Sequence, residues 1–130
     1  MGNIMSRGII TISEMGVFTI PTAPVWMTQF EIADLFGVFS YDIRKAIHAI
    51  YRNKELNETE TMKYVKQKKA NRISYDVYSL EMVIAVAFRI CSKESILFRR
   101  FVINEICATK KGSPVTLFFS CGKGSNLWYN

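Results

Sequence analysis

Apolar residues recur at helical spacing in two neighbouring segments near the middle of the first half of this chain. A first helix is expected over residues 28–36, with one apolar side: Ile32, Leu35 and Phe36. A second is expected over residues 40–53, with apolar residues three, four and seven positions apart: Ile43, Ala46, Ile47 and Ile50. Gly37 suits the left-handed end of the first helix, and Ala33 is small enough for a close crossing. The pattern predicts two short helices packed through a tight turn.

Strands are expected in four short runs rich in β-branched and aromatic residues: 8–13, 16–20, 61–66 and 72–78. The first two predict an N-terminal hairpin, which ends before Pro21 and Pro24. The last two predict a second hairpin, whose connecting residues 67–71 are rich in lysine. Its tyrosines are expected to pack it on the core. A single helical turn is expected before it, where residues 57–60 have a capping-box sequence.

Two more helices are expected over residues 79–90 and 93–109, the latter capped by Ser92. The last helix is apolar around most of its circumference: Ile96, Leu97, Phe98, Phe101, Val102, Ile103 and Ile106. Such a helix needs two partners, which favours a homodimer through residues 93–109. Residues 113–130 lack helical spacing and are read as a divergent tail after one domain, residues 1–112. The predicted fold class is α+β: a winged-helix-like helix-turn-helix domain with an N-terminal hairpin, a basic hairpin as wing and two C-terminal helices.

The composition favours a folded protein in the cytoplasm. The chain has 130 residues, 49% of them hydrophobic, enough for one core. The longest apolar run, residues 82–88, is far shorter than the roughly 20 residues of a membrane span, and no signal peptide is recognisable. Three cysteines and one histidine have no metal-ligand spacing, so no metal and no cofactor are expected. Cys91 and Cys107 fall within apolar helical patterns and are expected in the core.

The positive charge is concentrated in particular segments of the sequence. The net charge is +6, yet residues 1–61 carry five basic and seven acidic side chains. Residues 62–72 carry five basic and no acidic ones, and residues 89–130 carry seven basic and two acidic ones. The second hairpin therefore has the strongest positive field, which favours an anionic partner, although such a run is also typical of a solvated hairpin.

A helix pair followed by a basic hairpin favours binding of double-stranded DNA, with the second helix in the major groove. Ser40 is the expected N-cap of that helix. The residues expected to point outward at its start and to reach the bases are Ser40, Tyr41, Arg44 and Lys45. Thr28, Gln29 and Arg52 are candidates for backbone contacts. The hairpin supplies the expected phosphate contacts: Lys63, Lys66, Lys68, Lys69 and Arg72.

Two aromatic residues keep a second function class open. Phe39 and Tyr41 occupy positions where DNA-binding helices usually carry small or hydrogen-bonding side chains, although Phe39 also suits inward packing. An exposed aromatic pair there would favour a protein-interaction module, such as an antirepressor or accessory factor. An enzyme is not favoured, because the single histidine, His48, has no nucleophile motif around it and no carboxylate pair has a catalytic spacing.

Residues 25–109 resemble the RhuM-type virulence-associated protein family of bacteria. The matching segments are WMTQFEIADLFGV at 26–38, NKELNE at 53–58, YSLEMVIAVAFRICSK at 78–93 and FRRFV at 98–102. The resemblance implies a helix-turn-helix DNA-binding module, used in transcriptional regulation on mobile elements or virulence islands, without catalytic residues or cofactor. Longer relatives continue into a further C-terminal region, so the resemblance implies the N-terminal module alone. FSYD at 39–42 departs from the family's polar and basic pattern.

Overall fold

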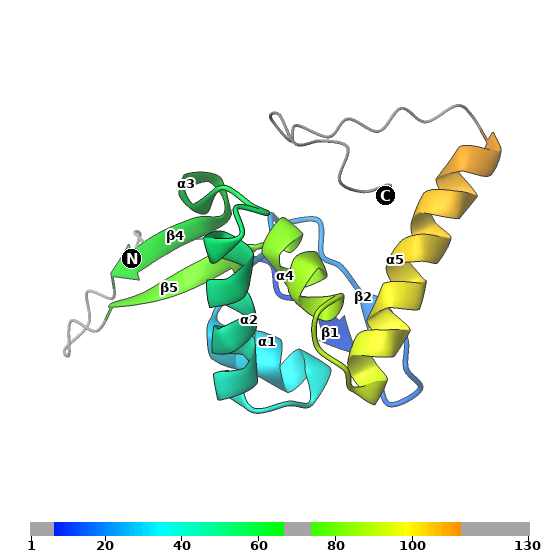
Figure 1. Cartoon of the computed structure of the whole chain (residues 1–130). Coiled ribbons are helices and arrows are strands. Elements are labelled where there is room, and N and C mark those ends of the chain that lie inside the picture. Colours follow the sequence, from blue (N-terminus) through cyan, green and yellow to red (C-terminus); the bar gives the residue numbers. More distant parts are fainter. Residues whose placement is uncertain (1–6, 67–73, 113–130) are drawn as a thin grey trace.

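The computed structural model describes residues 7–66 and 74–112, which form a mixed α+β fold (Figure 1). The described helices are α1 (Gln29–Phe36), α2 (Ser40–Arg52), α3 (Glu58–Thr61), α4 (Leu80–Ala87) and α5 (Lys93–Gly112). The described strands are β1 (Thr11–Ile12), β2 (Phe18–Thr19), β3 (Trp26–Met27), β4 (Met62–Lys66) and β5 (Ser74–Ser79). Strands β1 and β2 form one antiparallel pair, and the other three form an antiparallel sheet in the order β3-β5-β4. The predicted tail lies outside the described residues.

The predicted helix pair is present as α1 and α2. Each expected apolar residue of both helices is buried, as is Ala33. Gly37 ends α1 with φ of 65° and ψ of 36°, the left-handed conformation that a side chain makes costly. A Cβ at this position would also lie 2.9 Å from an oxygen of Glu94 at the start of α5. The expected turn between the two helices is therefore confirmed, with its glycine enclosed by a third helix.

The second hairpin is attached to the helix pair through a strand that the sequence pattern did not indicate. In β4 and β5, Met62 pairs with Tyr78 and Lys66 pairs with Ser74. The residue pair Trp26 and Met27 pairs with the end of β5 as strand β3. Because β3 continues directly into α1, backbone hydrogen bonds link the start of the helix pair to the hairpin.

The N-terminal hairpin is shorter than expected. Strands of two residues replace the predicted runs 8–13 and 16–20. Gly8 instead forms an isolated parallel bridge with Val25, and its N–H donates to the Pro24 carbonyl oxygen over 2.7 Å. A Cβ on Gly8 would lie 2.5 Å from the Ala23 carbonyl oxygen, so the close approach requires glycine. Gly8 therefore packs beside the segment before α1 rather than lengthening the hairpin.

The core lies between the helix pair, the three-stranded sheet and the last two helices. Phe98 of α5 is fully buried, with its ring centroid 5.1 Å from that of Phe18 and 5.4 Å from that of Phe36. Ser92 caps α5 as predicted, because its hydroxyl oxygen accepts a hydrogen bond from the Ser95 N–H. The same hydroxyl donates to the Phe36 carbonyl oxygen over 2.7 Å. The end of α1 is thereby hydrogen-bonded to the start of α5.

The far half of α5 extends beyond the rest of the described fold (Figure 1). Residues 103–109 are all exposed, which includes Cys107. Cys91 is also exposed, since α4 ends at Ala87, earlier than predicted, and leaves Cys91 in the connection to α5. The prediction that both cysteines lie in the core is wrong. An apolar pattern places a residue on a helix face, but it does not say whether another element covers that face.

Candidate nucleic-acid interface

The outward face of α2 carries basic side chains along the whole helix. Five exposed residues follow one another at intervals that place them opposite the buried stripe: Tyr41, Arg44, Lys45, His48 and Arg52. Three of them are arginine or lysine, and the one acid of this helix, Asp42, is partly buried and lines a groove beside this face. Of the four residues expected on this face, Tyr41, Arg44 and Lys45 are exposed on one side of α2, whereas Ser40 is partly buried.

Two aromatic side chains lie exposed at the first turn of α2. Phe39 is 80% exposed and Tyr41 is 61% exposed. The Lys45 ammonium lies 5.2 Å from the centroid of the Tyr41 ring, a cation–π contact between residues one helical turn apart. Phe39 occupies the N-cap position and makes no capping hydrogen bond, whereas Ser40 is already the first helical residue. Both the expected N-cap role of Ser40 and the inward packing of Phe39 are therefore wrong.

The β4–β5 hairpin carries further exposed basic side chains, on opposite faces of β4. Lys63 and Lys66 are exposed on β4, and the Lys63 ammonium lies 4.5 Å from the ring centroid of Trp26. Tyr64 is 69% exposed and donates to the Ser74 hydroxyl, while Tyr78 is buried, so the expected packing of the hairpin tyrosines holds for Tyr78 and fails for Tyr64. In Figure 1 the hairpin projects past α2 on the side away from α4 and α5. The predicted contacts Lys68, Lys69 and Arg72 lie outside the described residues.

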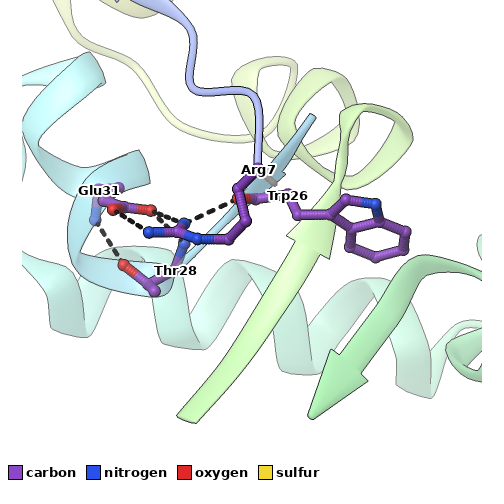
Figure 2. Close-up of polar contacts among 4 residues, drawn as sticks. All are labelled: Arg7, Trp26, Thr28 and Glu31. Carbon is purple, nitrogen blue, oxygen red and sulfur yellow. Dashed lines mark hydrogen bonds and ion pairs between the residues drawn. The ribbon is translucent and has the colours of Figure 1, made fainter. Parts of the chain in front are cut away.

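The start of α1 is held by a network of polar contacts (Figure 2). The Thr28 hydroxyl accepts the Glu31 N–H over 3.1 Å, and the Glu31 carboxylate accepts the Thr28 N–H over 2.8 Å. Both oxygens of that carboxylate also accept from the Arg7 guanidinium, over 2.7 and 3.1 Å, and the same guanidinium donates to the Trp26 carbonyl oxygen. Gln29, next along the helix, donates its amide to the Ser40 carbonyl oxygen. Thr28 therefore caps α1, and Gln29 links α1 to the start of α2.

The same network determines the charge state of Glu31. Burial alone would raise the pKa of this carboxyl, but the hydrogen bond and charge of Arg7, together with the Thr28 N–H, outweigh it and hold the pKa below its usual value. The hydrogen bond to Glu31 likewise raises the pKa of Arg7. The pair therefore stays ionised at neutral pH, and its two charges largely cancel beside the basic α2.

A shallow groove of about 430 Å³ runs along one edge of the basic face. Asp42, Lys45 and Ala49 of α2 line one side, and Arg89 and Cys91 line the other. Arg89 forms an ion pair with Glu55, with 2.6 Å between the nitrogen and the oxygen, and this pair is largely solvated. The groove is open and has one acid among its lining cations, so it adds less positive potential than the outward face of α2.

No protein-family model, curated protein or solved structure matches this chain. The resemblance to the RhuM-type family therefore stays a prediction. Within residues 7–66 and 74–112, no three His, Cys, Asp or Glu side chains gather as a metal site would need. Among the described helices, none has the length and hydropathy to cross a membrane.

Sequence reasoning missed two parts of this region. The contact of Arg7 with Glu31 joins residues 24 positions apart, and the contact of Lys63 with Trp26 depends on strand β3. Neither has a local sequence signal. Arg52 and His48, by contrast, follow the same helical spacing as Tyr41 and lie on the predicted face.

Proposed function

We propose that this protein binds double-stranded DNA as a winged helix-turn-helix domain. The observation that carries the proposal is the outward face of α2, where Arg44, Lys45 and Arg52 lie exposed together without an acid among them. The β4–β5 hairpin, whose ribbon extends past the same helix in Figure 1, carries the exposed Lys63 and Lys66. The order of elements also supports the proposal, since the helix pair is followed, after the short helix α3, by a hairpin that pairs with the strand before α1.

In this proposal α2 enters the major groove and the hairpin follows the phosphate backbone beside it. The first two turns of α2 supply the base contacts, from Tyr41, Arg44 and Lys45, while Lys63 and Lys66 neutralise phosphates. Arg52, at the other end of α2, adds a further phosphate contact. Each neutralised phosphate releases condensed counterions, so affinity depends steeply on salt. Transcriptional regulation is the usual use of such a domain.

The proposal is tested by fluorescence anisotropy of a labelled random-sequence duplex, titrated with the protein at several salt concentrations. Two double variants remove one part of the interface each: Arg44→Gln with Lys45→Gln on α2, and Lys63→Gln with Lys66→Gln on the hairpin. We expect each hairpin lysine to contribute about one unit to the slope of log affinity against log salt, so that the hairpin variant loses about two.

A matched control removes the same charge from another part of the fold. Lys93 and Arg100 are exposed on α5, and Lys93→Gln with Arg100→Gln changes the net charge by the same two units. The control variant should retain the wild-type salt slope to within half a unit. If all three variants weaken binding equally, the protein attracts DNA through net charge alone, and the proposed interface is wrong. The absence of binding by the folded protein at low salt would refute DNA binding itself.

A protein-interaction module is the second candidate, favoured by the exposure of Phe39 and Tyr41. Large exposed aromatic side chains are typical anchors of protein interfaces. Affinity capture from a nuclease-treated lysate, compared between the wild type and Phe39→Ser, tests this candidate. A defined protein that is retained only by the wild type would favour it, and equal retention by both would reject it.

The homodimer through α5 also stays a proposal. Ile96, Ile103 and Ile106 are between 41% and 48% exposed on this helix, which fits the expectation that it has apolar surface left for a partner. A dimer would place two copies of α2 against a two-fold DNA site. Sedimentation equilibrium at increasing concentration tests it, with Ile103→Lys as the variant that should shift the protein to the monomer.

A further inference from the structure

Phe39 lies at a position where its side chain does not stabilise the fold. It occupies the N-cap of α2 with an extended backbone, φ of −77° and ψ of 147°, and its side chain makes no capping hydrogen bond. Serine, threonine, asparagine and aspartate stabilise a helix at this position, and phenylalanine does not. The side chain is also 80% exposed, so it contributes little packing. Neither helix capping nor core packing explains a phenylalanine here.

The helix that begins after Phe39 combines exposed apolar surface with positive charge in its first two turns. Tyr41, two residues further along the chain, is 61% exposed, and the Lys45 ammonium lies over its ring. Arg44 lies exposed one turn along the same outward face. A partner that fits this surface must offer negative charge and a small apolar group close together.

The major groove of DNA offers both. Phosphates border it, and each thymine presents a C5-methyl group in it, whereas guanine, cytosine and adenine present only polar groups there. We propose that Phe39 packs against thymine methyl groups in the major groove and makes this protein prefer thymine-containing sites. This inference rests on the proposed DNA binding, and it adds to the base contacts of α2 one apolar contact at the start of that helix.

The test removes the methyl group from the DNA and the phenyl ring from the protein. Duplexes that bind the wild type are selected from a random-sequence library, and each thymine of an enriched duplex is replaced singly by deoxyuridine, which lacks only the methyl group. Affinity is measured by anisotropy for the wild type and for Phe39→Ser. We expect at least one replacement to weaken wild-type binding about fourfold, the value for one buried methyl group. Phe39→Ser should bind the thymine and deoxyuridine duplexes equally.

Two controls separate the contact from a change in folding. Serine is a preferred N-cap, so the thermal midpoint of Phe39→Ser should equal or exceed that of the wild type. Phe88→Ser removes a half-exposed phenylalanine that contacts Arg99, beside α5, and should leave the deoxyuridine effect intact. A lower midpoint for Phe39→Ser would show that the ring serves the fold, which would contradict the inference.

The outcomes distinguish a failure of the thymine contact from a failure of the proposed DNA binding. If the library is enriched and binding is salt-dependent, but no deoxyuridine replacement affects the wild type more than Phe39→Ser, DNA binding stands and the thymine contact is refuted. If no duplex is enriched and no duplex binds, both fail together. Loss of a captured protein partner in Phe39→Ser, with duplex affinity unchanged, would assign the ring to a protein interface instead.

Discussion

The contact between Arg7 and Glu31 predicts a measurable part of the stability of the helix pair. Replacing Glu31 by glutamine keeps an acceptor for the Thr28 N–H but removes the charge that holds Arg7. Hydrogen bonds to charged groups contribute about 1.5–3 kcal/mol when shielded, and exposed ion pairs about 0.2–1 kcal/mol. The two side chains are 20% and 28% exposed, so we discount the shielded value for solvent screening and expect a loss of about 1 kcal/mol. Glu31→Ala also removes the acceptor and should lose about 2 kcal/mol.

Urea denaturation at neutral pH measures these losses, and a double-mutant cycle with Arg7→Met isolates the pair. The pH dependence gives a second signature. Because the folded-state pKa of Glu31 is lowered, its stabilisation is complete above the unfolded-state pKa of about 4.3 and is lost as pH falls through the folded-state value. The difference between the wild type and Glu31→Gln should therefore be constant from pH 8 to pH 6 and should shrink below pH 5.

A coupling energy under about 0.3 kcal/mol at neutral pH, at the low end of the range for exposed pairs, would show that the contact does not stabilise the helix pair as expected. So would a difference between wild type and Glu31→Gln that stays unchanged on acidification.

Three further perturbations test the fold. Gly37→Ala should destabilise the protein by about 1–2 kcal/mol in urea denaturation, because the left-handed backbone disfavours a side chain, and Gly37→Asn should lose less; equal losses would contradict this cause. Lys54, at φ of 61° just beyond α2, is the reverse case, and Lys54→Gly should stabilise the protein by about 0.5–1 kcal/mol in the same assay. Burial raises the pKa of Tyr78 to about 12, so its stabilisation is present below pH 10 and is lost as pH rises towards 12; Tyr78→Phe should flatten this alkaline decline, and an identical decline would show that another group causes it.

The sequence predicts the helices far better than it predicts the contacts between distant segments. The spacing of Ile43, Ala46, Ile47 and Ile50 placed α2 and its outward face correctly, since one helical period determines both. Gly37 located the turn for an equally local reason, its tolerance of positive φ. Both signals lie within one helix or one turn, where the chain's own geometry is sufficient.

The misplaced features depend on contacts between distant segments. Strand β3 has two residues, and only its pairing with Ser79 and Tyr78 makes it a strand. The exposure of Cys107 depends on how far α5 extends past the core, which the apolar pattern of that helix does not encode. The predicted N-cap of α2, Ser40, lies one position after the observed N-cap, Phe39. The prediction was wrong because serine is a favourable capping residue and phenylalanine is not.

In the proposed interface, α2 and the hairpin strand β4 both contact DNA. Amide chemical-shift mapping tests it most directly, because each assigned residue of this 14.9 kDa chain reports its own surroundings as a duplex is added. We predict that the largest shift changes fall at residues 39–52 and 62–66, with residues 96–109 of α5 unchanged. Changes that centre on α5, or that spread evenly over all the basic residues, would contradict the proposed interface.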